Sequence, residues 1–406
     1  MKYFFNSDSL WSSLFHVLKS VIVLYLNWII LSNLNVQNYV LWSVTSSLLI
    51  VATASDFGIG QYTVTKLIHA NENDWARILI ESLLAIVPLS IVAFLFVFLS
   101  MTGGWEFKLI MASLLVLRIL TIPFGAFLNA KNKFKVRKIL EFVSYVLGTI
   151  VISILLYFKG SVYQLLIALN FCFFVGAIIT VHISCKSVHN WVSLSKINIV
   201  NSIKETFKGS FPFLANNITG LITYGGFVWI SSFFLPETSI GQLSVMHTFL
   251  FVSAYQMYDV FLKSRQADLI HSETIFQIKK ATKWIMIFSP IFIIVLGQPI
   301  LSIIAPQFKF SSADLALYSI FISCELGYLA FQSLIQVNKK LSHYLIRYSL
   351  IRLLTFVLSN ISFYFFSNKT DIFTYILFIL TGLIVSLIYY MYHSMAFSKK
   401  QLRGVL

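Results

Sequence analysis

Eight ionisable side chains fall inside long apolar stretches of the sequence, where a charge is costly. They are Lys19, Asp56, Glu81, Arg118, Glu141, Asp259, Glu325 and Arg352. On insertion scales, an ionised side chain at the centre of a membrane-spanning helix costs about 2.5–3.5 kcal/mol unless it faces a polar cavity or a partner. These residues are therefore the first candidates for a function that takes place inside a membrane.

Three of the eight lie deep in their apolar runs, and two interpretations of them stay open. Lys19, Arg118 and Glu325 are roughly 13 Å or more from either end of a predicted helix, at about 1.5 Å per residue. Arg118 and Glu325 either form a structural ion pair between two halves of the protein, or belong to a cationic site in a water-filled cavity. The two overlap, since such a pair can open and close during transport. The other five lie within one or two turns of a cytoplasmic end, from which side chains reach the headgroups.

The sequence contains no motif for enzymatic chemistry. There is no HExxH, no CxxC and no His/Cys cluster, and neither His182 nor His247 has a second ligand at metal spacing. Nucleotide loops of the GxxxxGK[ST] or GxGxxG type, a nucleophile elbow and a carboxylate pair in a soluble loop are also missing. We therefore expect a transporter without a metal or a cofactor, and not an enzyme.

The composition is that of a polytopic membrane protein. Mean hydropathy is +0.83, and only 11% of residues are charged, against about 25% in globular proteins. The apolar runs are continuous, which favours helices over alternating barrel strands. The formal charge of +15 does not indicate nucleic-acid binding, because the cations lie in loops where membrane orientation and anionic lipids account for them.

The apolar runs predict about twelve membrane-spanning helices. They are 10–34, 38–61, 77–101, 107–130, 139–158, 162–185, 207–235, 239–262, 284–306, 313–337, 344–366 and 372–397. After the fourth, five cations fall within eight residues: Lys131, Lys133, Lys135, Arg137 and Lys138. Loops rich in Lys and Arg stay on the cytoplasmic side, so this loop and the other even-numbered connections place both termini in the cytoplasm.

The longest connection, 186–206, divides the chain into two lobes of six helices, 1–200 and 201–406. LNAKNKF at 128–134 lies opposite IQVNKKL at 335–341, an offset of 207 residues, and the same offset sets Arg118 opposite Glu325. An even number of spans in each half indicates parallel repeats related by an axis along the membrane normal. We expect a cavity between the lobes.

Four segments resemble one transporter family. They are ASDFGIGQYTVTKL at 54–67, LNAKNKFKVRKILEF at 128–142, TSIGQLSVMHTF at 238–249 and IQVNKKLSHYLI at 335–346. Together with the twelve spans, they resemble the polysaccharide-exporter branch of the multidrug/oligosaccharidyl-lipid/polysaccharide (MOP) superfamily, and most closely its Wzx-type O-antigen flippases. The resemblance implies a MATE-like fold.

The resemblance also implies a substrate. Members of this branch move undecaprenyl-diphosphate-linked oligosaccharides from the cytoplasmic to the periplasmic face of the bacterial inner membrane by alternating access. Lys19, Arg118 and Arg352 would then bind the diphosphate. Asp56, Asp259 and Glu325 would couple transport to H+ or Na+ or gate the lobes. Membrane lipids and the polymerase and chain-length proteins of the same pathway are the expected partners.

Two alternatives remain. A multidrug or cation exporter of the same superfamily would favour an acidic central cavity, whereas the deepest charges here are two cations and one acid. A non-transporting membrane protein of a polysaccharide gene cluster, either a scaffold or a polymerase, is the second. A scaffold would tolerate neutralisation of Lys19, Arg118 and Glu325 together, and polymerases usually carry a large outer loop that this chain lacks.

Overall fold

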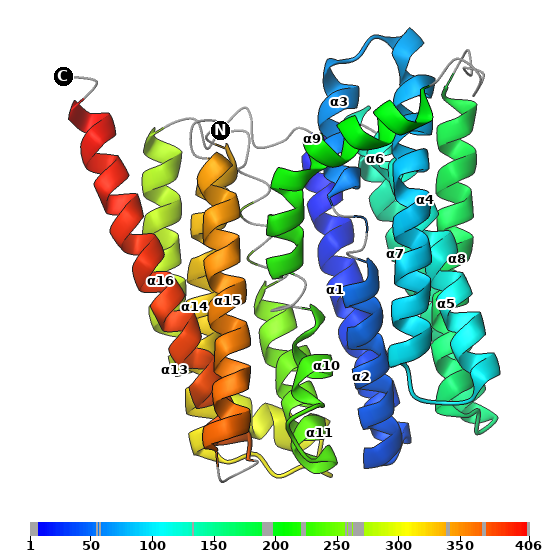
Figure 1. Ribbon diagram of the computed structural model, residues 1–406. Coiled ribbons are helices and arrows are strands. Elements are labelled where there is room, and N and C mark those ends of the chain that lie inside the picture. The colour runs from blue at the N-terminus through cyan, green and yellow to red at the C-terminus, as the bar shows by residue number, and fades with distance from the viewer. Residues whose placement is uncertain are drawn as a thin grey trace. The chain divides into compact units, whose positions relative to one another are not determined.

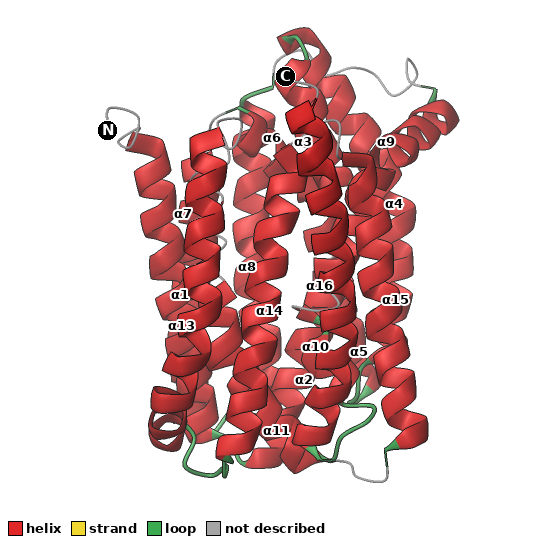
Figure 2. Cartoon of the chain, turned by 90° about the vertical axis from the view of Figure 1, so that its left-hand side faces the viewer, coloured by secondary structure: helices red, strands yellow, loops and turns green. Residues whose placement is uncertain are grey.

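The computed structural model describes residues 7–53, 56, 58–131, 134–188, 198–220, 225–255, 258, 262, 272–337, 342–367 and 371–403. Across these residues the chain forms helices and connecting turns without a strand (Figure 2). The expected all-α polytopic fold is thus confirmed. Asp259, one of the predicted site residues, lies outside the described residues.

The chain divides into two compact units, Met1–Trp229 and Ile230–Leu406. The boundary lies beyond the expected one at residue 200, because the helix that follows the long connection belongs to the first unit. This helix, α9 (Ile199–Gly220), packs on α3 and α4. The hydroxyl of Ser47 also bonds to the Gly225 carbonyl and accepts the Trp229 amide, which holds the segment after α9 in the same unit.

The N-terminal unit is built from pairs of adjacent helices (Figure 1). In chain order the helices of this unit are α1 (Ser7–Asn33), α2 (Val36–Thr53), α3 (Ile59–His69), the short η2 (Glu72–Asp74), α4 (Trp75–Ser100), α5 (Trp105–Leu120), α6 (Ile122–Ala130), α7 (Phe134–Tyr157), α8 (Val162–Lys186) and α9. Helix α7 packs between α1 and α8, α5 packs between α4 and α8, and α3 packs on α6.

Two of the expected spans are interrupted in this unit. The span predicted at 38–61 ends as α2 at Thr53, and α3 begins at Ile59 after a turn with Gly58 at φ 77°. The span predicted at 107–130 breaks between α5 and α6 at Thr121, just before Pro123. Proline has no amide hydrogen to donate and clashes with the preceding turn, but is well tolerated at the start of a helix. The break therefore follows from the position of Pro123.

The C-terminal unit contains longer helices. After α10 (Phe227–Ser231), which crosses the unit boundary, come α11 (Glu237–Met246), the π-helical η5 (His247–Val252), α13 (Ser272–Ile304), α14 (Ser312–Val337), α15 (Ser342–Phe366) and α16 (Ile372–Arg403). Helix α14 packs on α13, α15 and α16, and α15 packs on α16. Helix α13 starts earlier than the span expected at 284–306 and remains continuous through Pro290 and Pro299.

Eight helical segments in the described part of the chain are long and apolar enough to cross a membrane: Glu72–Ser100, Trp105–Ala130, Lys135–Tyr157, Val162–Lys186, Lys280–Ile304, Ser312–Ala330, Ile346–Phe366 and Ile372–Tyr389. A ninth, Val17–Asn33, is apolar but shorter. Large apolar side chains are exposed on these helices, such as Ile303 at 80% and Leu99 at 76%. The protein is therefore a multi-pass membrane protein, and the total of twelve spans stays a prediction.

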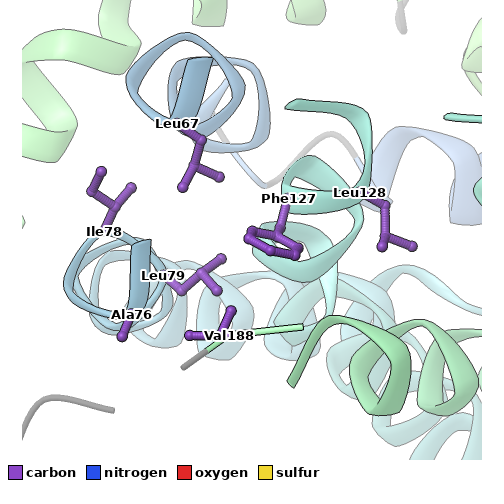
Figure 3. Close-up of a cluster of buried hydrophobic side chains, with 7 residues drawn as sticks. All are labelled: Leu67, Ala76, Ile78, Leu79, Phe127, Leu128 and Val188. Atoms are coloured by element: carbon purple, nitrogen blue, oxygen red, sulfur yellow. The ribbon is translucent and has the colours of Figure 1, made fainter. Parts of the chain in front are cut away.

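A buried apolar cluster joins α3, α4 and α6 at one end of the N-terminal unit. It contains Leu67, Ala76, Ile78, Leu79, Phe127, Leu128 and Val188 (Figure 3). The Phe127 ring meets Trp75 edge-on at 5.5 Å, and Lys131 Nζ lies 3.5 Å from the centroid of the same indole while donating to the Leu67 carbonyl. The cluster fixes α6, which contributes several residues to the site described below.

Truncating Phe127 should destabilise the N-terminal unit. The ring is 1% exposed, and replacing a buried Phe by Ala costs about 3–5 kcal/mol through lost contacts and the cavity left behind. We expect Phe127→Ala to lower the melting temperature of the purified protein in detergent by several degrees. Phe158→Ala is the control, because that ring is 73% exposed. Equal shifts in the two variants would contradict the assigned core.

Candidate functional site

The N-terminal unit encloses a cavity of about 630 Å³. Residues of α1, α3, α5, α6, α7 and α8 line it, together with Asp56 from the turn between α2 and α3. Its charged lining residues are Lys19, Asp56, Arg118, Arg137 and Glu141. Of the six predicted site residues, the structure thus brings Lys19, Asp56 and Arg118 to one cavity, which lies within a single unit.

Arg118 is positioned by the end of α5 and by two side chains of α8. The Thr121 hydroxyl closes the last turn by donating to the Arg118 carbonyl at 2.7 Å. The guanidinium Nη1 donates to Asn170 Oδ1 at 3.0 Å, and its Cζ lies 4.7 Å from the Phe173 ring centroid. A cation in the last turn of a helix is also favoured by the helix dipole.

The Arg118 charge is not balanced by an acid. Both of its contacts on α8, an amide and a phenyl ring, are uncharged, and no carboxylate of the described residues forms an ion pair with it. The guanidinium has five N–H donors, of which the hydrogen bond to Asn170 uses one. The arrangement leaves a cation in the cavity with donors available to a ligand.

Lys19 belongs to a cluster in which three cations share one carboxylate. Its Nζ lies 3.3 Å from Glu141 Oε2, which is also 3.0 Å from Lys138 Nζ, while Glu141 Oε1 lies 3.2 Å from Arg137 Nε. One acid balances one of the three positive charges. The wall of the cavity at α1 and α7 therefore carries a surplus of positive charge.

An aromatic pair joins the two cationic regions. Lys19 Nζ lies 5.2 Å from the Tyr145 ring centroid, and Tyr145 meets Phe173 edge-on at 4.7 Å. Phe173 in turn lies beneath Arg118. Asn129 lines the same cavity, and its carbonyl oxygen is a buried acceptor for which the described residues offer no donor. The cavity thus combines cations and ring faces, and a buried acceptor lies at its wall.

Asp56 has a structural role at the entrance to α3. Its Oδ1 accepts the Gly58 amide at 3.1 Å and its Oδ2 accepts the Gly60 amide at 3.2 Å. These bonds satisfy amides that the first turn of a helix otherwise leaves without a partner. The carboxylate therefore caps α3 while it lines the cavity.

Glu325 and Arg352 form a buried ion pair in the C-terminal unit, between α14 and α15. Their side chains are 3% and 4% exposed, and the Arg352 guanidinium lies 3.6 Å from the Tyr328 ring centroid. This differs from the pairing of Glu325 with Arg118 considered from the sequence. The reason is that α14 and α15 are packed neighbours, whereas Arg118 is held by α8 of the other unit.

Three residues of the site were not singled out from the sequence as candidates for a function: Arg137, Asn129 and Asn170. Glu141 was among the eight charged candidates, but it was assigned to the headgroup region and not to a binding site. The spacing of Arg137 and Glu141, four residues apart on one helix, is a visible signal for an ion pair. The Lys19–Glu141 contact spans 122 residues, and no local pattern predicts it. In the described part of the chain, no group of three or more His, Cys, Asp or Glu residues could hold a metal ion.

Comparison with solved structures identifies the fold. The Vibrio cholerae MATE transporter VcmN aligns with a TM-score of 0.59 at 13% identity over 97% of this chain and 96% of its own. The lipid II flippase MurJ aligns with a TM-score of 0.65 at 16% identity, over 95% of this chain and 87% of its own. The chain has the fold of the MOP transporters. No protein-family model and no curated protein matches the sequence.

A third similar structure is informative by its description. It is a MOP superfamily transporter from Pyrococcus furiosus with a TM-score of 0.52 at 13% identity over 96% of this chain and 95% of its own. Its binding pocket is described as having reverse polarity, which suggests a different function.

The turn that presents Asp56 to the cavity depends on Gly58. Its φ of 77° is unfavourable for other residues by about 1–2 kcal/mol, and a Cβ there would lie 2.7 Å from Phe213 Cβ of α9. We therefore expect Gly58→Ala to lower the melting temperature of the purified protein. Gly104→Ala is the matched control, because Gly104 has φ −65° and open space around it. A Gly58→Ala variant as stable as Gly104→Ala would contradict the described turn.

Proposed function

We propose that this chain is a flippase that moves an undecaprenyl-diphosphate-linked oligosaccharide, such as an O-antigen repeat unit, from the cytoplasmic to the periplasmic face of the bacterial inner membrane. The observation that carries the proposal is Arg118, an unbalanced cation with available donors in a cavity of about 630 Å³. The lipid II flippase MurJ, which has the same fold, supports a lipid-linked substrate.

The diphosphate accounts for the cations. Moving its negative charges through hydrocarbon without partners is prohibitively costly, and arginine binds phosphate oxygens through paired hydrogen bonds. Arg118 and Lys19 would hold the diphosphate in the cavity. Arg352, which the sequence grouped with them, is neutralised by Glu325 in the other unit, so we assign it no part in this cavity.

The other lining groups suit a sugar. The rings of Tyr145 and Phe173 offer apolar faces on which a pyranose can stack, and the Asn129 carbonyl oxygen can accept a hydrogen bond from a hydroxyl group. The cavity volume is within the range of about 300–1,000 Å³ that is usual for ligand sites. The lipid tail would remain in the bilayer.

Export of cationic drugs is the rival function, since MATE transporters have this fold. A site for a cation is expected to be acidic. Here the lining has three cations, Lys19, Arg118 and Arg137, and two acids, Asp56 and Glu141, and both acids already bond to groups of the protein. The balance of charge favours an anionic ligand.

Reversing the charge of Arg118 should abolish export. Loss of a charge-assisted hydrogen bond costs about 1.5–3 kcal/mol, which is about ten- to a hundredfold in affinity, and the new carboxylate adds repulsion. We expect cells that depend on an Arg118→Glu copy to lose surface glycan. Lys108→Glu is the control, because it makes the same change on the same helix without lining the cavity.

Three outcomes would contradict the proposal. Normal surface glycan with Arg118→Glu would mean that Arg118 does not bind the substrate. Unchanged glycan after neutralising Lys19, Arg118 and Glu325 together would favour a scaffold. Efflux of a cationic dye by the unaltered protein, enhanced in Arg118→Glu, would favour the drug exporter.

We also propose that H+ or Na+ entry returns the empty carrier. With a negative cell interior, outward movement of one negative charge gains about 2.3 kcal/mol per 100 mV, so coupling is needed only for the return. Asp56, which lines the cavity, is the candidate for binding the ion, and Glu325 a second. Proteoliposomes should therefore stop net transport when all ion gradients are collapsed, and transport at full rate under those conditions would exclude coupling.

A further inference from the structure

We infer that Glu141 is a resident counter-ion. Its carboxylate pairs with the cations of the cavity while no substrate is bound, and it pairs with them again when the anionic substrate leaves. The inference rests on the proposed function, and it assigns a role in release to a residue that binds no substrate. It starts from the three contacts of Glu141 with Lys19, Arg137 and Lys138, at 3.3, 3.2 and 3.0 Å.

The carboxylate and two of its cations face the cavity. Glu141, Lys19 and Arg137 all line it, and the Glu141 side chain is 26% exposed. A phosphate that enters the cavity offers the same kind of acceptor oxygens to the same N–H donors as the carboxylate does. The substrate and Glu141 therefore compete for Lys19 and Arg137.

Competition of this kind weakens binding and speeds release. In the empty protein the two cations are already paired, so that a substrate gains only the difference between its own contacts and those of Glu141. A transport site must bind tightly enough to load and weakly enough to unload. Without a counter-ion, the two cavity cations, Lys19 and Arg137, would hold a diphosphate too firmly.

Lys19 links this exchange to the packing of helices. Arg137 and Lys138 reach Glu141 from the same helix, four and three residues away respectively, so those contacts are local. Lys19 reaches it from α1, and this ion pair joins α1 to α7. When the substrate binds Lys19 in place of Glu141, the ion pair between the two helices is lost. Release of the substrate restores this ion pair.

The test measures the affinity for a diphosphate and the rate of glycan export separately. Purified full-length protein is titrated with geranylgeranyl diphosphate as the probe, and surface glycan export is measured in cells that depend on each variant. We expect Glu141→Gln to bind the probe at least about tenfold more tightly, because repulsion and competition are both removed, yet to export more slowly, because release is impaired. A side chain with only a structural role would not raise affinity while lowering transport.

Glu81→Gln is the matched control. Glu81 is also a carboxylate shared by cations, Lys66 at 3.5 Å and Arg77 at 2.9 Å, but it does not line this cavity. Its replacement should leave the affinity for the probe unchanged. If Glu141→Gln does not fold, the double variant Glu141→Gln with Lys138→Gln keeps the net charge of the cluster, frees the same two cavity cations and should still bind more tightly.

The outcomes distinguish this inference from the proposed function. Equal or weaker binding in a folded Glu141→Gln variant, or tighter binding with export at the normal rate, would overturn the counter-ion role alone. If the unaltered protein does not bind the diphosphate probe at all, the proposed function and the counter-ion role both fail.

Discussion

The cost of an ionised group in a membrane governs this structure, and the two units meet it in different ways. In the C-terminal unit, Arg352 and Glu325 neutralise each other in a site that is almost closed to solvent. In the N-terminal unit, Arg118 has uncharged partners, and Lys19 shares its acid with two further cations. A buried charge without a partner is strongly destabilising, so the second arrangement is explained by the polar cavity that these side chains line.

The cavity lies beside two interruptions of helices. One break, after α2, places Asp56 and Gly60 at the cavity wall, where the Asp56 carboxylate accepts the amides of Gly58 and Gly60. The other lies at Thr121 between α5 and α6, after Arg118 and just before Pro123. Irregular backbone at membrane depth is tolerated where it is buried in protein or lines a cavity. The same residues that interrupt the spans therefore build the site.

The sequence was sufficient for the class of fold, because long apolar runs leave helices as the solution in a membrane. It also singled out Arg118 and Lys19, since a charge deep in an apolar run is conspicuous without knowing its neighbours. The sequence could not predict which charged side chains form ion pairs with each other. The Lys19–Glu141 and Arg352–Glu325 pairs depend on which helices pack together, and the breaks at Gly58 and Thr121 depend on local turn chemistry inside runs that are apolar throughout. The cavity lined by Lys19 and Arg118 lies inside the N-terminal unit, and the expected cavity between the lobes stays a prediction.

The sign of the charge that the cavity binds is the central claim, and one measurement tests it directly. Purified protein can be titrated separately with inorganic pyrophosphate and with tetraphenylphosphonium, following the intrinsic fluorescence or heat of binding. We expect pyrophosphate to bind, a higher salt concentration to weaken this binding, and Arg118→Gln largely to remove it. Saturable binding of tetraphenylphosphonium with no binding of pyrophosphate would contradict the account.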